Sequence, residues 1–484
     1  MKRKIKLLVA AAALLTGSAQ GADSVPLKAV NKANEVIDAA IEAHGGADAL
    51  DELKTFVQES KFTNHAVGQS RKPGKPWDQN QTDNFVALDI ENEIFVGRVA
   101  GQGGGFTFDG GTIINGEQSY QIDYRGNTAA PIAEPDYDTN SGPTIRITPA
   151  LLMKQLMARR QTSHWLGEAE VDGRPHDIIT LVMEVGPALS LYIDRQSHML
   201  TRMERVLPPF GQVEYAFLDY EMVDGIALNQ RFKLFVNGDL NLVIDELQQK
   251  INTPVEQYTT VPSSMQPIPE VTPQDFASNE IDEGVFLIGG NGAYGLFVEM
   301  ADHVVAIGGT QGAAERIKAL REEIPDKPIR YGVLTHHHSD HVPATADYAA
   351  EGTIVITFKE NEEVVRAAAG TDDVKLQFVE DHLTLGSGDR RVELYNVGPT
   401  PHAENILIAY LPKEGIIFEA DHFPQAQTGP MPPAVPATVA FAAALDRLDL
   451  RYSKLVGAHS ARIGSPADLE AMLAHPSAAA TGSR

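Results

Sequence analysis

Hydrophobic and polar residues alternate along most of the first half of the chain. Short segments such as 55–62 and 213–220 place apolar side chains at every second position, the period of strands with one buried face. Residues 31–44 instead repeat their apolar positions at three- and four-residue steps, which predicts an amphipathic helix. We therefore expect a curved antiparallel sheet packed against little helix. Further predicted strands are 93–99, 119–124, 177–183, 189–194, 199–206 and 230–236.

From Gly284 onward, the pattern changes to apolar strands that alternate with helices. Residues 311–324, for example, place Ala313, Ile317 and Leu320 on one face of a predicted helix. The alternation occurs twice, which predicts two sheets packed back to back with helices outside. The predicted fold class is α+β with two domains. Predicted strands are 285–288, 296–300, 304–307, 329–334, 353–357, 392–397, 406–411, 415–419 and 454–457; predicted helices are 360–369, 439–448, 466–473 and one that opens at Pro343.

The first 21 residues have the pattern of a bacterial signal peptide. Four basic residues within the first six positions precede the apolar run 7–15, and Ala19-Gln20-Gly21 offers small residues at a cleavage site. The run is shorter than the roughly 20 residues that span a bilayer. We expect a periplasmic or secreted protein without stable membrane insertion.

Proline placement divides the mature chain. Residues 258–278 contain Pro262, Pro267, Pro269 and Pro273, a composition typical of a linker. The predicted organisation is a signal peptide (1–21), a β-rich domain (22–257), the linker (258–278), a second domain (279–476) and a disordered tail (477–484).

Composition narrows the chemistry. The 484 residues include no cysteine, which excludes disulfides, thiol nucleophiles and thiolate metal sites. Forty basic and 65 acidic residues give a net charge of −25, and loss of the four basic residues of the signal peptide would make it −29. Such a charge repels nucleic acid, so the expected partner is a small-molecule substrate. The oligomeric state is left open.

Four of the fifteen histidines lie within six positions, directly after the apolar strand that ends at Leu334. On an extended backbone His336 and His338 point the same way, so both can reach one metal ion. Asp340 and His341 follow at a turn and can reach a second ion. Nitrogen and carboxylate ligands of this kind suit zinc.

Three further candidates follow predicted strands in the second domain. They are His402, in the sequence VGPTPHAEN, Asp421, in GIIFEAD, and His459, in KLVGAH. Strand ends that meet at one edge of a sheet are the usual place for a site in such folds.

Together, Thr335-His-x-His-x-Asp-His341, His402, Asp421 and His459 resemble the metallo-β-lactamase-fold superfamily. The resemblance implies an αββα sandwich in which His336, His338 and His402 hold one zinc. Asp340, His341 and His459 would hold a second zinc, and Asp421 would bridge the two. One departure is visible: where the family often has Asp-x-Gly after an early strand, this chain has Gly308-Gly309.

The first domain diffusely resembles lipoprotein-carrier-like β-sheet domains. The likeness rests on the opening at His44 to Leu50 and on the hairpin sequence LYIDRQSHMLTRMER. It contains no catalytic signature. A glycine run at positions 101 to 105 neither follows a convincing strand nor opens a helix, so a dinucleotide loop is not indicated.

The resemblance implies hydrolysis by a hydroxide that bridges two zinc ions and attacks an ester, lactone or amide, with β-lactams included. Asp340 would orient the hydroxide and pass a proton to the leaving group. Two alternatives remain. One is a mononuclear iron oxygenase of the same fold that uses His336, His402 and Asp421. The other is a binding protein whose first domain holds a lipid or a partner.

Overall fold

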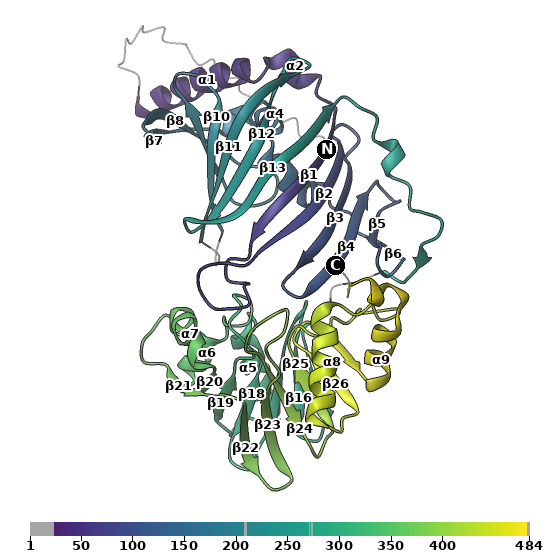
Figure 1. The fold of residues 1–484 in the computed structure, drawn as a ribbon. Coiled ribbons are helices and arrows are strands. Elements are labelled where there is room, and N and C mark those ends of the chain that lie inside the picture. The colour runs from purple at the N-terminus through teal and green to yellow at the C-terminus, as the bar shows by residue number, and fades with distance from the viewer. Residues whose placement is uncertain (1–23, 208–210, 271, 273, 482–484) are drawn as a thin grey trace, which may run out of the picture.

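The chain is described from a computed structural model, which covers residues 24–207, 211–270, 272 and 274–481. The predicted signal peptide lies outside these residues. The described chain has two parts, a large mostly antiparallel sheet and a sandwich of two mixed sheets with helices (Figure 1). The predicted fold class is confirmed. Within the described residues, no helix is both long and apolar enough to cross a membrane.

The N-terminal sheet has 14 strands in the order β14-β6-β5-β4-β3-β2-β1-β13-β12-β11-β10-β9-β8-β7. Neighbours are antiparallel, apart from the parallel pair of β6 and β14. The strands are β1 (Thr55–His65), β2 (Gln79–Asp89), β3 (Ile94–Gly103), β4 (Phe106–Ile114), β5 (Tyr120–Asp123), β6 (Thr128–Pro131), β7 (Trp165–Val171), β8 (Arg174–Leu181), β9 (Leu189–Asp194), β10 (Leu200–Leu207), β11 (Gly211–Val223), β12 (Ile226–Val236), β13 (Asp239–Ile251) and β14 (Gln266–Pro267).

More helix packs on this sheet than the pattern predicts. Residues such as Ile37 of α1 and Leu152 of α4 are buried in the core of its concave face. The sequence pattern does not predict helix α4, because this helix is apolar on most sides and therefore shows no amphipathic period. Pro143 and Pro149, which lie before and at its start, also argue against a helix there. The helices are α1 (Val25–Ala43), α2 (Ala47–Asp51), α3 (Tyr137–Ile147) and α4 (Pro149–Ala158), with short 3₁₀ helices at Arg160–Thr162 and Glu256–Tyr258.

The proline-rich segment covers the convex face of the sheet. Tyr258, Val261 and Met265 pack against a small apolar cluster there, and β14 adds a short edge strand beside β6. The segment is therefore held by side-chain burial along part of its length. At the other end of the chain, Pro476–Thr481 forms a 3₁₀ helix in which Ser477 Oγ donates to the carbonyl of Arg125, so the start of the predicted disordered tail is anchored.

In the C-terminal part, a seven-stranded and a six-stranded sheet enclose one apolar core. A second core lies beneath helices of the first sheet, including Ile317 of α5, Tyr348 of α6 and Val365 of α7. The predicted back-to-back sheets are thus present. The first sheet contains β15 (Ala277–Asp282), β16 (Val285–Gly290), β17 (Ala293–Glu299), β18 (Val304–Ile307), β19 (Ile329–Val333), β20 (Ile354–Thr357) and β21 (Lys375–Phe378); the second contains β22 (His382–Ser387), β23 (Arg390–Asn396), β24 (Leu407–Leu411), β25 (Ile416–Glu419), β26 (Lys454–Gly457) and β27 (Ser460–Gly464). The helices are α5 (Ala313–Glu323), α6 (Thr345–Ala350), α7 (Glu362–Ala369), α8 (Pro436–Leu448) and α9 (Pro466–Ala474), with a 3₁₀ turn at Lys359–Asn361.

Two projections of the N-terminal sheet contact the C-terminal part (Figure 1). One is the loop between β1 and β2, where the carbonyl of Gly68 accepts from the amide of Ser339 at 2.9 Å. The other is the tip of the β3–β4 hairpin, where the carbonyl of Gly105 accepts from the amide of Ala437 at 2.9 Å. These backbone bonds place both projections beside the C-terminal ends of the sandwich strands.

Replacing Leu296 by Ala is expected to destabilise the sandwich by about 2–5 kcal/mol, because the side chain is fully buried between the two sheets and its loss leaves a cavity. Leu473→Ala removes the same atoms from a side chain that is 37% exposed and should cost less than about 1 kcal/mol. Urea unfolding of both variants measures the difference. Equal midpoints would contradict this assignment of the core.

Candidate metal centre

The histidine cluster lies in the loop that follows β19. The rings of His336 and His338 are 4.4 Å apart, centre to centre, and both are buried. His337 is also buried, and its Nε2 donates to the carbonyl of Ser70 at 2.8 Å. The amide of His341 then donates to the carbonyl of His338, which closes the turn. His336 and His338 thus lie together as expected, although the ring of His337 is also only 4.9 Å from that of His338.

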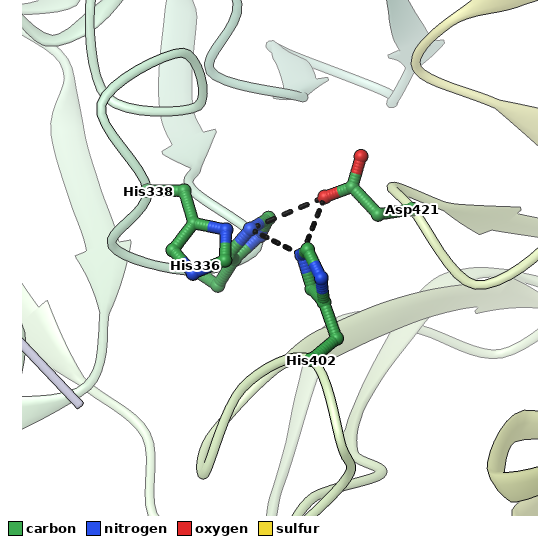
Figure 2. A group of neighbouring side chains, drawn as sticks. All are labelled: His336, His338, His402 and Asp421. Carbon is green, nitrogen blue, oxygen red and sulfur yellow. Dashed lines mark hydrogen bonds and ion pairs between the residues drawn. The ribbon is translucent and has the colours of Figure 1, made fainter. Parts of the chain in front are cut away.

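The three downstream candidates come to the same place. His402 lies in the loop between β23 and β24, Asp421 follows β25, and His459 lies between β26 and β27. Together with the histidine cluster they form two groups. Within each group, the potential ligand atoms lie within 4.8 Å of one another. Figure 2 shows the four residues of the first group pointing toward one another. The groups are His336, His338, His402 and Asp421, and Asp340, His341 and His459.

The carboxylate of Asp421 lies between the two groups. Its Oδ2 is 3.1 Å from Nε2 of His402 and 3.1 Å from Nε2 of His341, which belong to different groups. Its Oδ1 is 2.9 Å from Nε2 of His459. Asp421 is thus placed where the sequence resemblance implies a bridging ligand.

Backbone carbonyls fix which nitrogen of several rings carries the proton. Nδ1 of His402 donates to the carbonyl of Gly104 at 2.6 Å, and Nδ1 of His459 donates to that of Gly292 at 2.8 Å. A carbonyl only accepts, so in the neutral rings the Nε2 atoms carry lone pairs. In His338 the other nitrogen carries the proton, because Nε2 donates to the carbonyl of Ser70 at 3.0 Å. Its buried Nδ1 has no hydrogen-bond partner among the described residues.

These lone pairs face other acceptors. Nε2 of His402 is 3.2 Å from Nε2 of His336, and Nε2 of His341 is 3.1 Å from Nε2 of His459. Nitrogen and carboxylate atoms so close to one another require a proton or a cation between them. Imidazole and carboxylate are suitable zinc ligands, so the donor set fits a metal ion in each group.

The charge state of the site reflects burial and the Asp421 carboxylate. Burial lowers the pKa of His336 and of His338 well below the usual value, which keeps both rings neutral. For His459 burial is the largest single effect and acts in the same direction, but the hydrogen bond to Asp421, the charges of Asp421 and Asp340 and the hydrogen bond to Gly292 together raise the pKa to about 9. The pKa of Asp421 is well below its usual value despite burial, because His341, His402 and His459 surround it. The site therefore holds an ionised carboxylate between two kinds of ring: His336 and His338 are neutral, whereas Asp421 favours the protonated form of His402 and His459 when no other cation is present.

The N-terminal sheet contributes directly to the site, which the sequence did not reveal. Besides the carbonyls of Ser70 and Gly104, Gln69 Nε2 donates to Oδ1 of Asp340 at 2.8 Å. The ring of Phe106 meets that of His402 edge-on, with centroids 5.4 Å apart. The available signal was the glycine run at 101–105. A Cβ on Gly105, whose φ is +82°, would lie 3.0 Å from the amide nitrogen of His402, so the close approach requires glycine.

Comparison with known proteins identifies the domain. Residues 307–459 match the family described as "Metallo-beta-lactamase superfamily". The C-terminal half of the chain contains a metallo-beta-lactamase superfamily domain. The match begins after the N-terminal sheet, whose likeness to lipoprotein-carrier-like domains stays a prediction.

Individual relatives are distant. The alpha subunit of 2,4-dinitroanisole O-demethylase from Nocardioides sp. (strain JS1661) is 28% identical over 106 residues, which are 22% of this chain and only 32% of that protein. Among solved structures, the metallo-beta-lactamase FIM-1 of Pseudomonas aeruginosa is 16% identical, with a TM-score of 0.35 over 43% of this chain and 97% of its own. A metallo-beta-lactamase from Pontibacter korlensis is 20% identical, with a TM-score of 0.34 over 41% of this chain and 97% of its own.

The metallo-beta-lactamase domain has no room for a side chain where the family often has Asp-x-Gly. A Cβ on Gly309 would lie 1.7 Å from the carbonyl oxygen of His341, so only glycine fits. A buried carboxylate close to Asp421 is that of Glu419, whose Oε2 accepts from the amide of His422 at 2.7 Å. Burial raises the pKa of Glu419 to about 8, with Asp421 adding to the effect. Glu419 was not singled out from the sequence because it is one polar residue at the end of an apolar strand.

Two further histidines of this domain, His382 and His422, lie outside the two groups. His422 is buried and stacks on Phe441, with an interplanar angle of 12°, and its pKa is lowered to about 3 by burial. His382 is exposed and stacks on Tyr395.

The variant Gly105→Ala is expected to weaken binding of an added divalent metal ion by about 10–100-fold, because the added Cβ displaces the hairpin whose Gly104 carbonyl orients His402. Gly116→Ala is the matched control. Gly116 also has a positive φ, of +54°, but no atom lies within 4 Å of the added Cβ. Competition with a chromophoric chelator measures both affinities, and equal values for the two variants would contradict the role of the hairpin.

Proposed function

We propose that this protein is a zinc-dependent hydrolase with a dinuclear site, acting on a small ester, lactone or amide, β-lactams included. The observation that carries the proposal is the convergence of five imidazoles and two carboxylates, with ring tautomers set by backbone carbonyls. A structural role alone would not require so many lone pairs to face one another in a buried place.

The two groups suggest how the ligands divide. His336 Nε2, His338 Nδ1 and His402 Nε2 would hold one ion, and Asp340, His341 and His459 the other. Asp421, which reaches both groups, would contact each ion. Zinc ions bound there would supply Lewis acidity and bring the pKa of a bound water toward neutrality.

Asp340 is suited to hold and move a proton. Gln69 fixes its Oδ1, while its Oδ2 lies 3.4 Å from Nε2 of His341. The side chain is 44% exposed, in contrast to Asp421 at 9%, so it faces the space that a substrate would enter. In this position Asp340 orients a water molecule and passes a proton to the leaving group.

The cavities beside the centre favour a small substrate. One of about 440 Å³ contacts Gln69 and His402, and one of about 180 Å³ contacts Asp421 and His459. Phe106 of the N-terminal hairpin lines both. The net charge of −25 opposes a nucleic-acid substrate. A signal peptide at residues 1–21 would deliver the enzyme to the periplasm or the medium.

The purified mature protein is expected to contain two zinc ions per chain, and a chelator should abolish its hydrolytic activity until zinc is restored. The substrate panel comprises a β-lactam, a lactone, an aryl ester, a thioester and a phosphodiester. It also includes 2,4-dinitroanisole, because of the distant relative. Metal analysis with these assays tests the proposal. Bound iron with oxygen uptake, or turnover insensitive to the chelator, would refute it.

Asp340→Asn is expected to lower kcat by about 10²–10⁴-fold, because the amide cannot accept a proton. The amide oxygen can still accept from Gln69 and contact a metal ion, so much of the metal content should remain. Asp326→Asn, an exposed residue on the same domain, is the control for charge and should leave kcat unchanged. Full activity of the Asp340 variant with both metals bound would exclude this role.

A further inference from the structure

The concave face of the N-terminal sheet encloses a cavity of about 670 Å³ that the proposed hydrolase chemistry does not use. Its walls come from β1 to β5, from β10 to β13, and from α3, which closes one side. Phe62, Phe95, Phe108 and Leu234 make much of the lining apolar. The volume is in the range of sites that hold small organic molecules.

Three arginines interrupt this apolar lining, and two of them, Arg146 and Arg205, lie close to each other. Arg146 comes from α3 and Arg205 from β10, and the guanidinium carbon of Arg205 lies 5.6 Å from the ring centre of Tyr215. Nε of each arginine is buried without a hydrogen-bond partner among the described residues. Of the described residues that line the cavity, none is Asp or Glu. Two positive charges thus share one cavity without a neutralising carboxylate.

Other arginines of this sheet have such partners. Arg98, at the edge of the cavity, pairs with Asp109 at 2.8 Å, and Arg202, three positions before Arg205 on the same strand, pairs with Glu204 at 2.9 Å. The chain has 65 acidic residues, yet these two half-buried arginines have no carboxylate partner among the described residues. Holding them in this way has a cost in the stability of the fold. Burial lowers the pKa of Arg146 and the neighbouring Arg205 lowers it further, while Tyr215, which hydrogen-bonds with Arg146, raises it by a smaller amount. A ligand that supplies the missing negative charge would remove this cost.

We infer that the concave cavity is a binding site for an amphipathic organic anion, with an apolar body and one carboxylate, sulfate or sulfonate group. The anionic group contacts Arg146 and Arg205, because guanidinium groups form paired hydrogen bonds with planar or tetrahedral oxyanions. The body lies against Phe62, Phe95 and Leu234. The inference does not depend on the metal centre, since binding at the arginines requires no zinc.

The matched probes are 8-anilinonaphthalene-1-sulfonate and N-phenyl-1-naphthylamine, which share a fluorescent body and differ by the sulfonate. The mature protein is expected to bind the sulfonate more tightly. In Arg146→Gln/Arg205→Gln, affinity for the sulfonate should fall by about tenfold or more, while affinity for the neutral probe stays the same. Fluorescence titration measures both. Unchanged sulfonate binding in the double variant would overturn the inference, as would an equal loss of both probes.

Arg202→Gln is the control, because it removes an arginine of the same strand that is already paired and points away from the cavity lining. Its binding of both probes should match that of the parent. Thermal unfolding gives an independent reading. Without ligand, the double variant should unfold at the same or a higher temperature than the parent, because it no longer holds two charges together. A lower temperature would indicate that the arginines serve the fold and would count against a ligand site.

Discussion

The carboxylate of Asp421 is the constraint around which the metallo-beta-lactamase domain is arranged. It is ionised and its side chain is only 9% exposed, and ring nitrogens from the loop after β19 and from two further loops, after β23 and β26, meet it within 3.2 Å. Such an arrangement is stable only if positive charge is shared among these atoms. Both sheets of the sandwich contribute to it, because the histidine cluster follows β19 of one sheet and Asp421 follows β25 of the other. Their packing therefore sets the geometry of the centre.

The outer contacts of the centre come largely from a different part of the chain. The carbonyls of Ser70 and Gly104 orient His338 and His402, and the amide of Gln69 holds Asp340. These groups lie on two projections of the N-terminal sheet, about 270 to 300 positions away in sequence. Neighbours that orient ligands influence affinity nearly as strongly as the ligands themselves. The two parts of the chain thus form one site, although each has its own apolar core.

The sequence was informative where chemistry is concentrated in short segments. The spacing of His336, His338, Asp340 and His341 after an apolar strand was enough to predict that they would meet, and His402, Asp421 and His459 could be placed from strand ends. Positions whose role arises from tertiary packing could not be found in this way. A carbonyl such as that of Ser70 carries no side-chain signal, and α4 has no amphipathic period because it is buried on most sides. Arg146 and Arg205 also look like ordinary surface residues until the sheet brings them together.

The β3–β4 hairpin belongs to both sites at once. Val99 and Phe108, partway along its two strands, line the concave cavity, while Gly104 at its tip accepts the hydrogen bond of His402. A pair of antiparallel strands is stiff along its length. The hairpin therefore connects the cavity, which lies partway along its strands, with the metal centre at its tip. Any change in the curvature of the sheet moves the Gly104 carbonyl relative to the imidazole that it orients. The orientation of the His402 ring therefore depends on the curvature of the N-terminal sheet.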